Sequence, residues 1–114
     1  MATIDPVIVD GESRTFLASW SLGDGDMGAP IRYPGAADRT VQLVGNFGGA
    51  TVAIQGSLDG EHWATLSDGQ GNAISVTGEA LEAITELVRF VRPVVTGGSG
   101  ASITVLLLLM RTTI

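Results

Sequence analysis

The sequence contains no cysteine and no lysine, and its only histidine is His62. Without cysteine the protein forms no disulfide bond, no thiol nucleophile and no zinc–thiolate site. A single histidine also leaves no histidine pair with metal-ligand spacing. All six basic residues are arginines, and they oppose 12 acidic residues, which gives a net charge of −6. Because nucleic-acid and anionic-membrane binding rely on clustered cations, we expect neither partner.

Long apolar segments are also missing. The N-terminus lacks the charged and apolar regions of a signal peptide. The longest apolar run, Val105 to Met110, is far shorter than the ~20 residues of a membrane-spanning helix. Yet only 16% of the residues are charged, and the mean hydropathy is +0.35. A small domain of this composition has more apolar surface than its core hides, so we expect self-association or docking on a partner.

The residues that are present favour short antiparallel strands. Between Val41 and Val76, apolar and polar residues alternate, and glycine-centred turns such as Asp59-Gly60 separate the alternating runs. A period of two is typical of half-buried strands, and Asp-Gly pairs tolerate the positive φ of tight hairpins. The pattern predicts an all-β fold, an antiparallel β-sandwich of jelly-roll type.

The domain organisation follows from length and composition. A chain of 114 residues forms one domain. We divide it into an N-terminal strand or arm at 1–13 and a single β-sandwich domain at 14–114. Residues 78–83 favour at most one short helical turn, with Glu79 near its start. Pro93 is expected at a sheet edge or bulge.

The last predicted strand, 102–113, is apolar on both faces. A half-exposed strand of a lone sandwich alternates with polar residues. Either a loop and the N-terminal arm cover the second face, or this face meets another subunit, and we favour a homo-oligomer, a trimer or a dimer. Arginines 89 and 92 join the predicted interface, unless Glu82 or Glu86 pairs with them internally. The oligomer-interface candidates are Leu106, Leu108, Met110, Arg89 and Arg92.

Candidate reaction or metal sites have little support. His62 follows Asp59 and Glu61 in the turn SLDGEHW, but no cysteine and no second histidine accompanies it, so we interpret it as part of a surface turn. The loop Asp24-Gly25-Asp26 has part of a calcium-loop pattern without its later ligands. No nucleophile–histidine–carboxylate order is present. We therefore predict no cofactor, no metal, no catalytic residue and no enzyme activity.

Four motifs resemble those of small structural proteins of tailed bacteriophages. They are Gly25-Asp26-Met27-Gly28-Ala29-Pro30, Ala37-Asp38-Arg39 with Val41-Gln42-Leu43, Gly56-Ser57-Leu58-Asp59-Gly60 with Trp63 and Leu66, and Val91-Arg92-Pro93-Val94 with Gly97-Gly98. The resemblance implies a head decoration or cement protein on the outside of a virion, assembled in the host cytoplasm, with the major capsid protein as partner. The capsid-contact candidates, in the N-terminal arm and the 23–39 loop, are Asp24, Asp26, Met27, Ile31, Tyr33, Val7 and Ile8.

The sequence is also compatible with two alternative functions. One is a ring-forming component of the virion neck or tail. The other is a carbohydrate-binding β-sandwich, in which Trp20, Tyr33 and Trp63 would form an aromatic platform.

Overall fold

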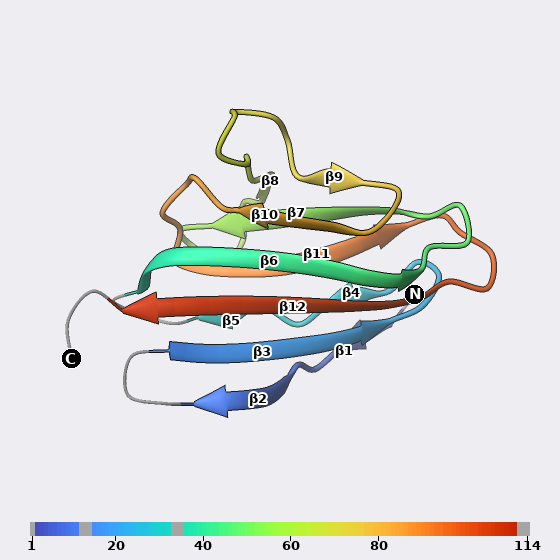
Figure 1. Ribbon diagram of the computed structural model, residues 1–114, viewed down its shortest axis with the longest axis horizontal. Helices are drawn as coiled ribbons and strands as arrows, with labels where there is room; N and C mark the ends of the chain where they lie inside the picture. The colour runs from blue at the N-terminus through green and yellow to red at the C-terminus, as the bar shows by residue number, and fades with distance from the viewer. Residues whose placement is uncertain (1, 12–14, 33–35, 112–114) are drawn as a thin grey trace.

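The computed structural model describes residues 2–11, 15–32 and 36–111, which form two β-sheets packed face to face (Figure 1). The predicted all-β sandwich is confirmed. Across the described residues no helix occurs, and so none is long and apolar enough to span a membrane. The predicted helical turn at 78–83 is instead the strand β10 (Ala80–Ala83), because its backbone pairs with Thr40–Leu43 of a neighbouring strand. Tertiary pairing here overrides local propensity.

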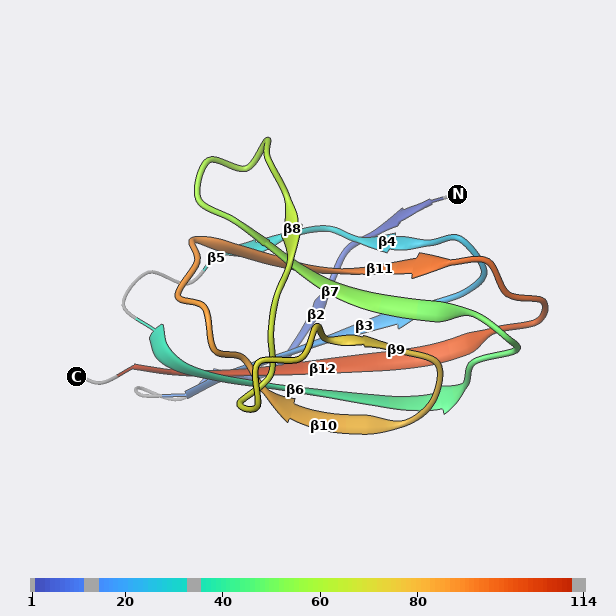
Figure 2. The same ribbon diagram turned by 90° about the horizontal axis from the view of Figure 1, so that it is seen from above.

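Sheet A has seven strands and sheet B has five. The strands of sheet A are β1 (Thr3–Ile4), β4 (Met27–Gly28), β5 (Ile31–Arg32), β7 (Thr51–Ser57), β8 (Ala64–Thr65), β9 (Ser75–Val76) and β11 (Phe90–Thr96). The strands of sheet B, in spatial order, are β10, β6 (Ala36–Asn46), β12 (Ser102–Arg111), β3 (Thr15–Leu22) and β2 (Val7–Gly11). Figure 2 separates the two layers, with β4, β11 and β7 above β12, β6 and β10.

Strand β12 is the central strand of sheet B and pairs with both β3 and β6. Val105 lies opposite Trp20 on one side and Leu43 on the other. Because side chains alternate along a strand, one set of β12 residues points between the sheets. These inward residues, each at most 3% exposed, are Ile103, Val105, Leu107 and Leu109. The other apolar set lies on the outer face of sheet B.

Trp20 connects the two sheets. Its side chain is buried, and its indole Nε1 donates a hydrogen bond to the carbonyl oxygen of Ala29, 3.0 Å away. Gly28 lies against this contact: a Cβ atom there would be 2.6 Å from Cδ of Pro93 and 2.7 Å from Nε1 of Trp20. Glycine at 28 is therefore a packing requirement.

Pro93 lies inside β11, away from the sheet edge where the sequence placed it, and is paired with Ile54 of β7. The backbone N–H of Val95 points toward the β4 side, where it donates to Asp26. Pro93 is two residues before Val95, so its nitrogen faces the same side of β11. On that side it lies opposite the gap between the short strands β4 and β5. The missing N–H of proline therefore costs no ladder hydrogen bond.

The N-terminal segment packs on its own sandwich. Strand β1 pairs in parallel with β4, and β2 pairs antiparallel with β3 at the edge of sheet B. The described part of 1–13 thus extends both sheets sideways, and it does not lie over the outer face of β12.

We expect Gly28→Ala to lower the free energy of unfolding by about 1–3 kcal/mol, because the new methyl group overlaps Pro93 and Trp20. Gly78→Ala is the matched control, since no heavy atom lies within 4 Å of a Cβ at that position. Urea denaturation of both variants measures the difference. Equal midpoints would show that the contact between the sheets is loose.

Candidate functional site

Among the side chains of sheet B that the structure describes, Arg39 is the one charged group buried on the inner face. The residue is 5% exposed, and neither Nε nor Nη1 has a hydrogen-bond partner among the atoms of the described chain. An arginine keeps its charge and five N–H donors at any ordinary pH. Leaving such donors unpaired away from water is costly, so this arrangement is unusual for a purely structural residue.

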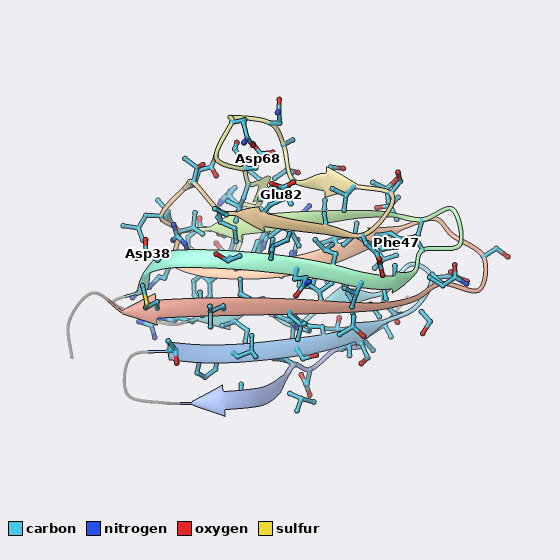
Figure 3. All side chains as sticks on the ribbon, viewed as in Figure 1. Asp38, Phe47, Asp68 and Glu82 are labelled. Atoms are coloured by element: carbon cyan, nitrogen blue, oxygen red, sulfur yellow. The ribbon has the colours of Figure 1, made fainter. Side chains whose placement is uncertain are left out.

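The register of sheet B aims Arg39 inward. On β6 it shares one face with Val41 and Leu43, which are buried in the core. Arg39 lies opposite Leu109 of β12, and Leu109 in turn lies opposite Phe16 of β3. The guanidinium therefore belongs to an otherwise apolar row that crosses three strands. Figure 3 marks this end of the sandwich with Asp38, while Phe47 marks the opposite end.

The nearest acidic groups do not pair with Arg39. Burial lowers the pKa of Arg39 from its ordinary value, and the charges of Asp38 and Glu86 offset part of this effect. Asp38 is the preceding strand residue, so its side chain points to the opposite face and is exposed. Glu86 accepts a 2.7 Å hydrogen bond from the backbone N–H of Ser67, which lowers the pKa of Glu86. Both carboxylates therefore supply charge at a distance and no hydrogen bond.

The other buried polar residues have partners in turns. The hydroxyl of Ser57 donates to Asp59 and accepts from the backbone of Gly60, each at 2.9 Å. Asp68 accepts from the backbone N–H groups of Gln70 and Asn72. Arg39 thus differs from every other buried polar side chain of the described residues in having unpaired nitrogen atoms.

This site suits an anion and does not suit a metal ion. A metal centre in a protein needs about three histidine, cysteine or carboxylate ligands. The buried inner-face side chains of the described strands offer none of these, and the single histidine lies elsewhere. A buried guanidinium is instead suited to a carboxylate, with which it forms charge-assisted hydrogen bonds.

The predicted surface turn around His62 lies outside the sandwich. Its Nδ1 is 2.6 Å from Oδ2 of Asp59, and its side chain is 88% exposed. Backbone N–H groups of His62 and then Glu61 hold the pKa of Asp59 well below its ordinary value. Ligand atoms of Asp59, Glu61 and His62 lie within 4.8 Å of one another. The hydrogen bonds of the turn account for this cluster.

The predicted capsid-contact residues fall in several environments. Asp24 accepts hydrogen bonds from the backbone of Gly100 and Ala101, both at 2.8 Å, and so ties two loops together. Asp26 accepts from Gly23 at 2.8 Å. Both carboxylates of the calcium-like loop therefore accept backbone hydrogen bonds that stabilise the loops. Of the remaining candidates, Ile31 is in the core, Met27 is paired in β4, Val7 and Ile8 are exposed on edge strand β2, and Tyr33 lies outside the described residues.

The predicted oligomer-interface residues divide between the two sheets. Leu106, Leu108 and Met110 lie together on the outer face of sheet B. Arg92 lies on sheet A, where its Nε donates to Oε1 of Gln55 at 3.0 Å and its guanidinium stacks 3.9 Å from the Trp63 ring centre. Arg89 precedes β11 and bonds through its backbone to Ser57. One surface therefore cannot contain all five residues.

The aromatic residues of the sugar-binding alternative are also separated. Trp20 is in the core at 1% exposure, and Trp63 lies against Arg92 and Phe90 on sheet A. They form no common platform.

Comparison with known proteins finds structures of similar fold. No protein-family model matches the sequence, and no curated protein matches it. A cupin superfamily protein of Desulfitobacterium hafniense has a TM-score of 0.52 at 14% identity, over 94% of this chain and 77% of its own. A Klebsiella pneumoniae protein with a double-stranded β-helix domain has a TM-score of 0.53 at 13% identity, over 95% and 75%. The chain therefore has the jelly-roll fold of a cupin-type double-stranded β-helix.

The resemblance to bacteriophage structural proteins is consequently wrong. The similar structures with TM-scores above 0.5 described above are a cupin superfamily protein and a protein with a double-stranded β-helix domain, and neither is a phage decoration protein. The motifs behind the resemblance are hairpin turns and strand faces, which specify sandwich geometry and not a role. The virion function is wrong with it, in its head, neck and tail forms. The sugar-binding alternative is wrong for a separate reason, because Trp20 is buried in the core and away from Trp63. The capsid partner and virion location have no other support.

The exclusion of enzyme activity is wrong as well. A sugar phosphate isomerase of the cupin superfamily, from Silicibacter pomeroyi, is among the similar structures, with 18% identity, a TM-score of 0.46, and coverage of 90% of this chain and 54% of its own. Missing catalytic motifs in the sequence do not exclude an enzyme from such a fold. The likeness is one of fold and gives this chain no activity by itself.

Arg39 escaped the sequence analysis, although a signal for it was present. Arg39, Val41 and Leu43 have the same parity on one strand, so alternation places the arginine on the core face. In the sequence analysis Arg39 is assigned only to the Ala37-Asp38-Arg39 motif. A charged residue at a core position of an alternating strand indicates a functional or strained site.

We expect Arg39→Met to maintain or raise the free energy of unfolding, by up to about 3 kcal/mol, because it replaces an unpaired buried charge with an apolar side chain of similar length. Arg92→Met is the control, and it should lose about 1–2 kcal/mol with the Gln55 hydrogen bond and the Trp63 stack. Thermal denaturation of both variants compares them. A loss for Arg39→Met as large as for Arg92→Met would mean that Arg39 is structurally paired.

Proposed function

We propose that the protein binds a small organic acid between its two sheets, with the ligand carboxylate on Arg39. The observation that carries the proposal is the buried guanidinium whose Nε and Nη1 have no partner among the described residues. A carboxylate would restore the missing hydrogen bonds and neutralise the charge in one step. The cupin-type fold is consistent with a ligand site between the sheets, although the fold alone specifies no ligand.

The surroundings of Arg39 favour one negative charge on an apolar body. Leu109 and Phe16 continue the row that starts at Arg39, and Val41 lies beside it on the same face of β6. These apolar side chains offer no hydrogen bond to a second charge on the ligand. The charges of Asp38 and Glu86, which act on Arg39, would also repel a dianion more strongly than a monoanion. A monocarboxylate therefore fits better than a phosphate. The proposal is one of binding, and it assigns no reaction.

Hexanoate is a suitable probe, because it joins one carboxylate to an apolar chain. At ten times its Kd it should stabilise the folded state by about 1.4 kcal/mol, which corresponds to a rise in Tm of roughly 5 °C for a domain of this size. The neutral analogue hexanamide should give no rise. Inorganic phosphate should give a smaller rise than hexanoate. Differential scanning fluorimetry measures all three.

Two variants make the test specific. Arg39→Met should abolish the hexanoate shift, while Arg32→Met, which removes an exposed arginine on β5, should retain it. An equal hexanoate shift in the wild type and in Arg39→Met would refute the proposal. So would an equal response to hexanamide.

A further inference from the structure

The outer face of sheet B carries a groove that is lined mostly by leucines. The groove has a volume of about 240 Å³ and is lined by Leu17, Thr40, Gln42, Leu81, Leu106 and Leu108. None of these six residues is charged, in a protein whose net charge is −6. Leu81 is 63% exposed and Leu108 is 40% exposed. Exposed leucines that line one groove mark a contact surface and not scattered apolar side chains.

No described segment of the chain covers this face. The N-terminal strands, which the sequence analysis considered as a cover, lie beside β3 and β4 in the planes of the sheets. Strand β10 pairs with β6 at the other edge of sheet B. The face therefore stays open across its full width of five strands.

We propose that this face binds the same face of a second copy of the chain, around a two-fold axis. Charge favours this occupant: two acidic proteins repel each other, and a face whose groove residues are all uncharged lets them meet without opposing like charges. A two-fold interface places one patch against itself, and an apolar patch with a groove and projecting leucines is complementary to itself.

The area of the face is sufficient for a dimer. Five strands about 4.8 Å apart and about eight residues long present roughly 600 Å². Two such faces together present roughly 1,200 Å², which reaches the lower end of the about 1,200–2,000 Å² of total surface that specific interfaces bury. Val7, which is 66% exposed on edge strand β2 and lies opposite Ser19, adds apolar area to this face beyond the groove. The surface lies on the opposite side of sheet B from Arg39, so the dimer does not depend on the proposed ligand.

Sedimentation equilibrium tests the proposal. At about 100 μM, well above a micromolar Kd, the wild-type protein should sediment with twice the 11.7 kDa mass of one chain. Leu108→Asp and Leu81→Asp, made separately, should each weaken association at least tenfold, because they place a desolvated charge in the interface. Leu81 is on an edge strand, so its variant should fold even if Leu108→Asp does not.

Leu58→Asp is the control, since Leu58 is 68% exposed in the loop after β7 of sheet A. It should remain dimeric, with an unchanged Tm. A wild-type mass of 11.7 kDa at this concentration would overturn the proposal. A Leu81→Asp variant that stays as dimeric as Leu58→Asp would overturn it as well. Hexanoate binding at Arg39 should be the same in the monomeric variants, so the two proposals fail separately.

Discussion

The register of β12 between β3 and β6 is the constraint on which the rest of the structure depends. It points Val105 and Leu107 into the core and leaves Leu106 and Leu108 outside. Through the pairing with β6, the same register turns Arg39 inward. A slip of one residue would exchange the two faces of the strand. The core, the buried guanidinium and the apolar outer face therefore have one common origin.

Arg39 is where the local rules of folding disagree with the fold. Strand pairing, alternation and apolar packing are consistent across sheet B, yet a charged group whose Nε and Nη1 have no hydrogen-bond partner among the described residues lies at the end of its inner face. Natural proteins accept such conflicts mainly at functional sites, where stability is lower than the scaffold would allow. A carboxylate ligand would resolve the conflict, because the group that destabilises the free protein would then hold the bound molecule. Arg92, with Gln55 and Trp63 as partners, shows how an arginine of this fold is stabilised without a ligand.

Much of the fold followed from the sequence, but little of the site did. Alternation and glycine turns predicted the sandwich, and the apolar pattern of 102–113 marked a strand with two apolar faces. Residues 80–83 were not predicted as a strand, because pairing with β6 and not local preference determines their structure. The predicted virion function was wrong because turn motifs such as Asp59-Gly60 specify hairpin geometry and no chemistry. Arg39 was readable from parity alone, but its lack of partners depends on where Glu86 and Ser67 lie in three dimensions.

A crystal structure of the protein grown with hexanoate tests the central claim most directly. The account predicts a hexanoate oxygen within about 2.7–3.2 Å of Nε or Nη1 of Arg39, with the alkyl chain against Leu109 and Phe16. A crystal grown with hexanoate that shows no hexanoate at this site, and in which the Arg39 guanidinium forms hydrogen bonds with the carboxylate of Glu86 or Asp38, would contradict it.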